Sequence, residues 1–457
     1  MSSDWSEYCI DDIKAKSPSS IAIGPFGSRM KSDCYVESGV RVVRGTNLSE
    51  GPTLSGEFVF ISPEKAAELG GANLDPSDLV FPHRGAIGEV GIIPDDDEKY
   101  VLSSSLMKLK CDLLKADPKF IYYFFKSSVG RFELLKNSSQ VGTPGIGQPL
   151  TSLKSIRLRL PNIAEQKRIS AVLGSLDNRI TLLRETNQTL EAIAQALFKS
   201  WFVDFDPVRA KSEGRVPEGM DETTAALFPD GLEMSELGEI PRGWQVCSVD
   251  DLAERVGMGP FGSNIKVDTF VNSGVPVISG QHLKQHLVED VAFNFITIEH
   301  AQRLAKSCVE AGDVIFTHAG NIGQVSLLHK DSSFPLYILS QRQFFLRCKR
   351  DLISPEWALL YFKSRQGQHQ LLANASQVGV PSIARPVTYL RSIRLVIPPV
   401  ELNRRFAGIA EEVNTKVMAN RKQLNTLIAI RDSLLPRLIS GQLRLPDAEA
   451  EIEALAA

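Results

Sequence analysis

Two stretches of the chain place their apolar residues in a helical heptad repeat. One stretch follows Pro161 and the other follows Pro399. Apolar positions in each are separated alternately by four and three residues, which is the spacing of a coiled-coil seam, so we predict two long helices. The seam positions are Ile169, Leu173, Leu176, Ile180, Leu183, Asn187, Leu190, Ala194, Leu197 and Trp201, and then Phe406, Ala410, Val413, Val417, Asn420, Leu424, Leu427, Arg431, Leu434 and Leu438.

The two seams can pair with each other in an antiparallel coiled coil. Placing Asn187 opposite Asn420 lets two polar core residues satisfy each other's amides, which fixes the register of the pair. The same alignment puts Arg431 opposite Leu176, which fits poorly. The alternative is two amphipathic helices, each packed only on its own domain. The remaining pairs of the alignment are Ile169 with Leu438, Ile180 with Leu427, Leu197 with Ala410, and Trp201 with Phe406.

The sequence outside these stretches repeats itself. Gly24-Pro25-Phe26-Gly27-Ser28 recurs as Gly259-Pro260-Phe261-Gly262-Ser263, at an offset of 235 residues. Residues 139–142 recur as 376–379, at an offset of 237 residues, and loop insertions produce small changes of this kind. Such ordered matches indicate a tandem duplication. The period is too long for a solenoid, so each copy is expected to be a domain with its own core.

The patterns together predict an α+β chain: two tandem duplicated mixed α/β domains, each followed by a long helix, with the two helices forming an antiparallel coiled coil. Pro, Gly and acidic residues between the first helix and the second copy indicate an ordered connector with turns. An Ala- and Glu-rich end indicates a frayed tail. The predicted parts are 1–160, first domain; 161–202, first helix; 203–240, connector; 241–397, second domain; 398–441, second helix; and 442–457, tail.

Composition places the chain among ordinary globular proteins. It has 457 residues, 23% of them charged and 43% hydrophobic. No apolar run approaches the roughly 18 residues that cross a bilayer, and the first residues lack the basic and apolar regions of a signal peptide. A cytoplasmic protein without membrane attachment is expected. The six cysteines include no Cys-x-x-Cys pair, which argues against a zinc ribbon or a disulfide framework.

Charge at first argues against a nucleic-acid partner, because the net charge is −3 and DNA-binding proteins usually have a basic excess. The copies differ, however. Residues 1–155 hold 17 Lys and Arg against 20 Asp and Glu (17 − 20 = −3), and residues 240–397 hold 16 against 12 (16 − 12 = +4). The balance therefore excludes tight DNA binding by bulk electrostatics alone, and partners would have to supply phosphate contacts.

Common catalytic signatures are absent from the sequence: there is no GxxxxGK(S/T) loop, no GxGxxG after a strand, no GxSxG and no HExxH. Residues 94–99 resemble a nuclease PD…ExK motif, but they are too close together to lie on adjacent strands and indicate an acidic turn. His83 and His318 occupy equivalent positions of the two copies without a second ligand nearby, so no metal site is expected. We therefore expect no catalytic residues and no cofactor in this chain.

Glycine-rich loops in both copies hold side chains suited to reading DNA. Arg, Lys, Asn, Gln and His hydrogen-bond to base edges and phosphates, and glycine lets the backbone approach a ligand closely. For any single residue, an ordinary polar loop is the alternative. The predicted DNA-binding residues are Ser28, Arg29, Lys31, Arg44, His83, Arg84 and Gln140 in the first copy, and Asn264, Lys266, Gln281, His282, His318, Asn321 and Gln377 in the second.

The framework motifs are kept between the copies, whereas the loop residues beside them change. Arg29 corresponds to Asn264, and Arg84 corresponds to Ala319. Arg44 likewise corresponds to a serine. Two similar scaffolds with different loop residues are expected to recognise two different targets.

The chain resembles the specificity subunit of type I restriction-modification systems over nearly its whole length. The most specific motifs are Ala196–Val208, Ser235–Trp244 and Leu434–Gln442, and the two Gly-Pro-Phe-Gly-Ser loops also recur in such proteins. The resemblance implies a host-defence protein with two target recognition domains, each reading one half of a bipartite double-stranded DNA target, and with antiparallel helices that hold the domains apart.

The resemblance also implies partners. Two methyltransferase subunits dock on the helical regions, and translocase-nuclease subunits join them. S-adenosylmethionine, ATP and magnesium belong to those partners, which agrees with the absence of catalytic motifs here. A duplicated protein-interaction scaffold without DNA specificity is the main alternative, and an enzyme with an unrecognised active site is a weaker one. Neighbouring methyltransferase and helicase-nuclease genes would distinguish them.

Overall fold

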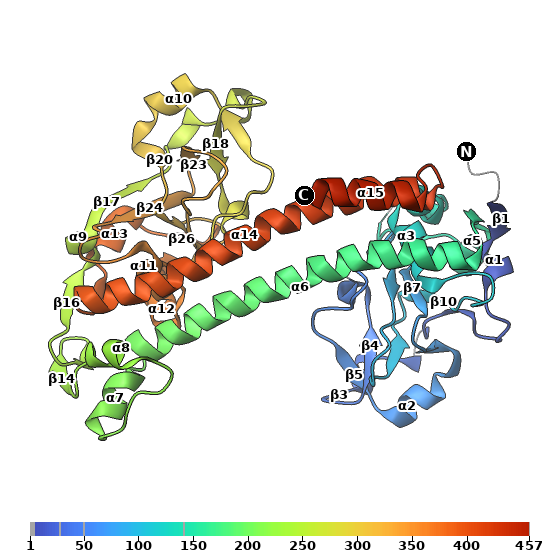
Figure 1. Cartoon of the computed structure of the whole chain (residues 1–457), viewed down its shortest axis with the longest axis horizontal. Helices are drawn as coiled ribbons and strands as arrows, with labels where there is room; N and C mark the ends of the chain where they lie inside the picture. Colours follow the sequence, from blue (N-terminus) through green and yellow to red (C-terminus); the bar gives the residue numbers. More distant parts are fainter. Residues whose placement is uncertain (1–4, 27–28, 49–50, 140–141, 457) are drawn as a thin grey trace. The chain divides into compact units, whose positions relative to one another are not determined.

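The computed structural model describes residues 5–26, 29–48, 51–139 and 142–456. It divides into two compact units: unit 1 is residues 1–184 with 422–457, and unit 2 is residues 185–421. The two long helices, α6 (Ile163–Phe202) and α14 (Val400–Ile439), each contribute one end to each unit, as the colours of Figure 1 make visible. Within the described ranges, no helix is long and apolar enough to span a membrane.

Unit 1 is a mixed α/β domain with two main sheets. Its strands are β1 (Ser6–Cys9), β2 (Ile21–Ile23), β3 (Tyr35–Val36), β4 (Val40–Val43), β5 (Val59–Ile61), β6 (Asn73–Leu74), β7 (Leu79–Pro82), β8 (Gly91–Ile92), β9 (Tyr100–Leu102), β10 (Leu106–Leu109), β11 (Ser138–Ser139), β12 (Gly145–Ile146) and β13 (Arg157–Leu160). A four-stranded antiparallel sheet has the order β2-β10-β7-β8. A five-stranded sheet has the order β3-β5-β4-β9-β6, with β4 and β9 parallel.

The four-stranded sheet of unit 1 is buried on both faces, and its central strand β7 is apolar at successive positions. Leu79 and Phe81 of β7 point into a core shared with the helices, whereas Val80 points into the core of the five-stranded sheet. Side chains alternate between the faces of a strand, so a continuous apolar run is what a doubly covered strand requires.

Unit 2 repeats this arrangement. Its strands are β14 (Leu232–Ser235), β15 (Gly238–Pro241), β16 (Gln245–Ser248), β17 (Ala253–Met258), β18 (Val275–Ile278), β19 (Asn294–Ile296), β20 (Cys308–Val309), β21 (Val314–Thr317), β22 (Val325–Leu327), β23 (Tyr337–Leu339), β24 (Gln343–Cys348), β25 (Ala375–Ser376), β26 (Ser382–Ile383) and β27 (Arg394–Ile397). The order β17-β24-β21-β22 matches β2-β10-β7-β8, and Phe316 and Ile315 again point into different cores. The predicted duplication and fold class are confirmed.

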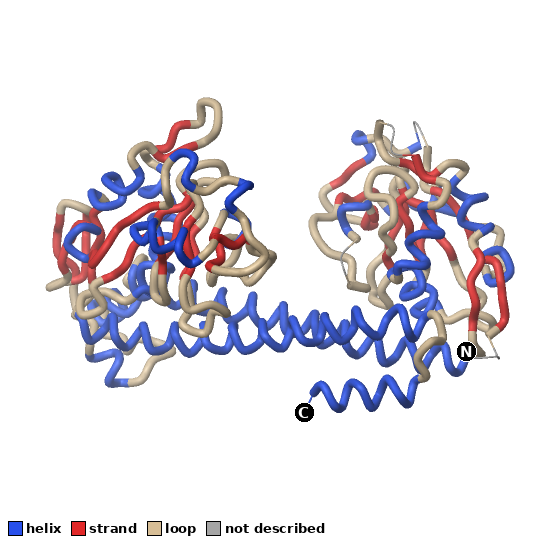
Figure 2. The backbone as a smooth tube through the Cα atoms, turned by 90° about the horizontal axis from the view of Figure 1, so that it is seen from above, coloured by secondary structure: helices blue, strands red, loops and turns tan. Residues whose placement is uncertain are grey.

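Short helices pack around the sheets and beside the long helices in both units (Figure 2). Unit 1 has α1 (Ile10–Ile13), α2 (Pro63–Glu68), α3 (Pro118–Lys126), α4 (Ser128–Leu135), α5 (Pro149–Ser155) and α15 (Leu445–Ala456), and unit 2 has α7 (Asp206–Ser212), α8 (Glu222–Ala226), α9 (Val249–Leu252), α10 (Ile298–Arg303), α11 (Pro355–Lys363), α12 (Arg365–Leu372) and α13 (Pro386–Ser392). Both α3 and α11 begin with a side-chain cap, Asp117 or Ser354, followed by proline.

The long helices pack against each other inside each unit. In unit 1, Leu173 of α6 and Leu434 of α14 share one core with α3. In unit 2, the rings of Trp201 and Phe406, which the seam alignment pairs, lie 5.9 Å apart between centroids. Each end of the helix pair therefore belongs to a domain core and to the coiled-coil seam at once.

The polar seam residues are paired. Asn420 Nδ2 donates to Asn187 Oδ1 at 2.8 Å, as the alignment predicts. Arg431, which fits poorly opposite Leu176, instead donates from Nη1 to Asp177 Oδ1 at 3.0 Å. Asp177 follows Leu176 directly in α6, and the sequence alignment of the two seams did not identify it as the partner of Arg431.

The expectation of a frayed C-terminal tail is wrong. Residues 445–456 form α15, in which Leu445 and Ala448 are buried in the core of unit 1 and Glu451 pairs with Arg437 at 2.7 Å. Three-to-four-residue spacing of small and apolar residues makes this short helix amphipathic, and the Ala-rich composition hid that pattern. The connector is ordered, with α7 and α8 packed into unit 2 through buried Val208 and Phe228.

Candidate nucleic-acid interface

The Gly-Pro-Phe turn of each copy is held tightly by the strand beside it. A Cβ on Gly24 would lie 1.8 Å from the Ser103 carbonyl oxygen, and a Cβ on Gly259 would lie 1.8 Å from that of Ser340. Each glycine also donates its N–H to the neighbouring strand, Gly259 to Gln343 O at 2.9 Å. Glycine is therefore required here for close backbone approach.

Three loop segments of the first copy meet beside this strand. A Cβ placed on Gly45 would lie 3.6 Å from the Ala86 side chain, so these two loops are in contact. Ile146 donates its N–H to His83 O at 2.9 Å. An isolated bridge joins Arg84 to Gly145. The structure therefore brings the segments that contain Arg44, His83 and Arg84 together.

The second copy gathers its loops in the same way. Ile383 donates its N–H to His318 O at 2.8 Å, and an isolated bridge joins Ala319 to Ser382. The site for a Cβ on Gly280 lies 3.0 Å from Gln324 Oε1. Equivalent loops thus form an equivalent surface in unit 2.

The predicted contact residues differ in how available they are. Ser28 and Gln140 lie outside the described residues. Arg44 donates from Nη2 to Glu57 O at 2.8 Å, and Arg29 donates to Glu68 O at 3.3 Å. Asn264 donates to Phe261 O at 2.6 Å, and Gln281 donates to Ala292 O at 3.0 Å. The remaining exposed residues of the predicted set are Lys31, Arg84, Lys266, Asn321 and Gln377.

His83 and His318 are held neutral by burial, which lowers the pKa of each imidazole. The Nε2 atom of His83 lies 3.1 Å from Ser104 O, and that of His318 lies 3.0 Å from Gln341 O, so each Nε2 carries a proton and donates to a carbonyl. No cluster of ligand-type side chains suited to a metal ion occurs in the described part of the chain.

His282 is an interior residue of the loop that contains it. Its Nδ1 accepts from the backbone N–H of Ser279 at 2.9 Å, and its ring stacks on Phe293 with centroids 4.3 Å apart. Asn47 occupies the same position of the first copy and accepts from the Arg44 N–H at 3.0 Å. Both side chains close the same turn, so the structure gives His282 a place in the scaffold of the surface.

We expect His282→Asn, which copies the first domain, to make unit 2 less sensitive to acid. Burial lowers the pKa of His282, so the unfolded chain takes up a proton below about pH 6.5 that the folded chain does not. Stability is therefore present above that pH and is lost as the pH falls. Hydrogen exchange of the β18 amides at pH 7.5 and 5.5 measures the change, and an equal loss in both proteins would contradict it.

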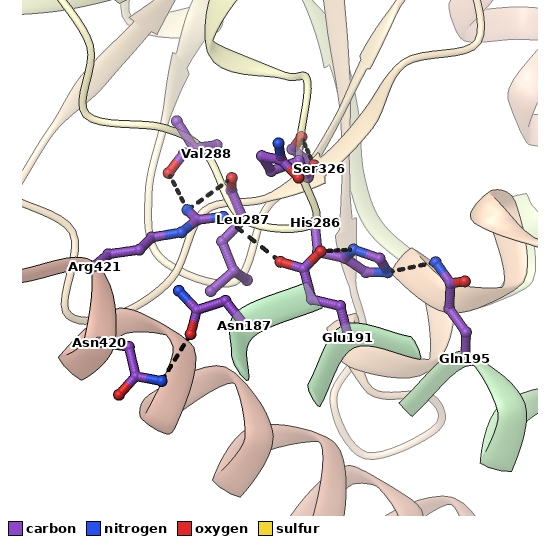
Figure 3. A network of polar contacts seen from close by, with 10 residues as sticks. Asn187, Glu191, Gln195, His286, Leu287, Val288, Ser326, Asn420 and Arg421 are labelled. Atoms are coloured by element: carbon purple, nitrogen blue, oxygen red, sulfur yellow. Dashed lines mark hydrogen bonds and ion pairs between the residues drawn. The ribbon is translucent and has the colours of Figure 1, made fainter. Parts of the chain in front are cut away.

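A polar network fixes one loop of unit 2 to both long helices (Figure 3). His286 Nδ1 lies 2.8 Å from Glu191 Oε2, and Gln195 donates to His286 Nε2 at 2.8 Å. Arg421 of α14 donates to Leu287 O at 3.1 Å and lies 3.7 Å from Glu191 Oε1. Burial acts to raise the pKa of Glu191, but the hydrogen bond from His286 and the positive charge of Arg421 hold it below its usual value.

This network was missed by sequence reasoning, because its members come from three distant segments. Periodicity finds residues of a helix seam, and Glu191 and Arg421 lie beside the seam. The first copy has Gly51 where the second has His286. The contribution of His286 to such a network is therefore specific to the second copy.

Comparison with known proteins agrees with this architecture. Residues 3–192 match the family described as the type I restriction modification DNA specificity domain. The chain is 25% identical to the type I restriction enzyme HindI specificity subunit of Haemophilus influenzae, over 96% of this chain and 100% of that protein. The chain is therefore similar to type I restriction-modification specificity subunits.

Other specificity subunits are similar as well. The MjaIX specificity subunit of Methanocaldococcus jannaschii is 24% identical over 72% of this chain and 70% of its own length. A solved structure of the S subunit of a type I restriction-modification system from M. genitalium has a TM-score of 0.59 at 15% identity, over 96% of this chain and 97% of that one. This chain therefore shares its fold with that protein.

Proposed function

We propose that this chain is a specificity subunit, which selects the DNA sequence on which a type I restriction-modification complex acts. Each copy reads one half of a bipartite double-stranded target, and neither copy carries out catalysis. One observation carries the proposal: two equivalent loop surfaces keep the same backbone supports and present different polar residues. Different half-sites require that combination, because base edges are read by side-chain donors and acceptors.

The proposed partners follow from the similarity to type I restriction-modification specificity subunits. Two methyltransferase subunits dock on the paired helices and supply S-adenosylmethionine chemistry, and translocase-nuclease subunits supply the steps that need ATP and magnesium. A near-neutral chain, with a net charge of −3, needs such partners for phosphate contacts. Asn187 and Asn420 set the register of the helix pair on which the methyltransferases dock.

The test of the proposed function is the methylation pattern of a host DNA. The full chain is co-expressed with the methyltransferase of its own gene neighbourhood, and methylated adenines are mapped by sequencing. A bipartite target that disappears when this chain is omitted supports the proposal. Methylation of the same sites without this chain would leave a protein-interaction scaffold as the better account.

We expect Arg44→Ala to relax or abolish recognition of one half-site and leave the other intact. A good bidentate contact to a base discriminates by about 1–3 kcal/mol, which is roughly 5- to 150-fold between right and wrong bases. Competition binding with half-site mismatches measures this ratio. Arg157→Ala is the matched control, because it removes an exposed arginine of unit 1 from β13, a strand that contains none of the predicted contact residues. An unchanged specificity profile in Arg44→Ala removes this residue from the proposed contacts.

A further inference from the structure

An exposed phenylalanine stands at the same position in both copies. The side chain of Phe26 is 59% exposed and that of Phe261 is 71% exposed. They are 235 residues apart, which is the offset of the surrounding motif. Large aromatic side chains are normally packed inside a domain. An exposed ring retained in both copies therefore indicates a contact that the free chain does not make.

The backbone that precedes each ring is held in place by its neighbours. Gly24 and Gly259 approach their neighbouring strands too closely for any side chain, and the prolines that follow, Pro25 and Pro260, are buried. The turns are thus anchored on one side, and the rings project on the other. A rigid aromatic presented in this way loses little conformational entropy when it binds.

The rings keep their identity while the polar residues around them change. Arg29 and Arg84 of the first copy correspond to Asn264 and Ala319 of the second. The ring of Phe26 lies 6.4 Å from the ring of His83, which places it among the predicted contact residues.

This combination favours DNA over a partner protein. Two identical methyltransferase subunits would require the same polar residues around the ring in both copies. Two different DNA half-sites require different polar residues around it. Aromatic stacking suits a constant residue at such a place, because every base has a π-face and stacking is tolerant of sequence.

We propose that Phe26 and Phe261 each insert at one DNA half-site and partly unstack a base step. The inference rests on the proposed function and adds that the rings and the polar residues around them have different roles. The rings supply affinity and DNA distortion that are independent of sequence, as apolar wedges do in other DNA-binding proteins. The polar residues around each ring supply the sequence preference.

The experiment uses the complex of the full chain with its methyltransferase subunits and the target found by methylation mapping. Duplexes carry 2-aminopurine at successive positions of each half-site, and its fluorescence rises where stacking is lost. We expect Phe26→Ala to abolish the rise in one half-site and Phe261→Ala to abolish it in the other. Affinity should fall roughly tenfold to a hundredfold for each variant, with the target sequence unchanged.

Two further variants separate stacking from loss of apolar surface. Phe26→Tyr keeps an aromatic face and should keep the fluorescence rise. Leu114→Ala removes an apolar side chain that is 88% exposed in the same unit, in the turn before α3, and should bind DNA like the unchanged protein. An equal affinity loss in Leu114→Ala overturns the insertion.

The remaining outcomes are distinct. A complex that neither binds nor methylates a specific site overturns the proposed function and the insertion together. Specific binding with unchanged fluorescence and affinity in both alanine variants overturns the insertion alone. Loss of methyltransferase co-purification in either variant assigns the rings to a protein contact and also overturns the insertion.

Discussion

Replacing Arg431 by methionine destabilises unit 1 by about 3–5 kcal/mol, the usual effect of removing one partner from a buried ion pair. The side chain of Asp177 is 4% exposed and that of Arg431 is 16% exposed, so the Asp177 carboxylate has little access to solvent. Tyr123 also donates to Asp177 Oδ2 at 2.8 Å. Without Arg431, the carboxylate keeps its burial and loses its main counter-charge.

The comparison variant removes the whole polar group. Arg431→Met with Asp177→Leu and Tyr123→Phe leaves no buried charge and no unpaired hydroxyl, and it should recover most of the loss. Hydrogen exchange of α6 amides from 163 to 184 reports unit 1, and amides of α11 in unit 2 serve as the internal control. A loss below about 1 kcal/mol in the single variant would show that the pair is not a buried one.

Lys108→Met is expected to have an effect of similar size, about 3–5 kcal/mol, on the sheet of unit 1. Lys108 Nζ lies 3.2 Å from Asp78 Oδ2 in the middle of the four-stranded sheet, and both side chains are buried. Burial already raises the pKa of Asp78 despite the lysine. Removing the lysine raises it further, so the variant loses most stability at neutral pH and regains part of it as the pH falls toward 4.

The second copy supplies a matched experiment. Asp313, equivalent to Asp78, is held by Arg347 through two hydrogen bonds of 2.8 Å. Arg347→Met should weaken unit 2 and leave unit 1 unchanged. Asp78→Asn added to Lys108→Met should recover stability. Hydrogen exchange of β10 and β24 reads the two sheets separately, and a loss in the wrong unit, or in both, contradicts the assignment.

Sequence reasoning predicted the features that recur at fixed spacing. The duplication, the two long helices and the pairing of Asn187 with Asn420 follow from periodicity and from one alignment constraint. The tail helix was missed because alanine and glutamate mark both frayed and helical segments. The burial of Leu445 and Ala448 in the core of unit 1 favours a helix over a frayed segment. The residues that bury them are distant in sequence, so the tail sequence alone does not reveal this packing.

The candidate site was predictable in outline only. Glycine-rich motifs located the loops, and the loops do meet in each copy. Sequence could not distinguish a side chain that reads a ligand from one that closes a turn. His282 and Asn47 have equivalent geometry and different chemistry, so only coordinates reveal their shared role. Similarly, exposure of Phe26 and Phe261 depends on how their neighbours pack, which the motif does not state.

The discontinuous composition of unit 1 sets the order in which a ribosome can complete the two units. Unit 2 is one uninterrupted segment, residues 185–421, whereas the core of unit 1 needs residues from the last segment, 422–457, such as Leu434 and Leu438. At 5–20 residues per second, roughly 10–50 s pass between synthesis of residue 184 and residue 422. During that time Leu173 and Leu176 of the nascent chain have no α14 to cover them. The unit made first is therefore finished last.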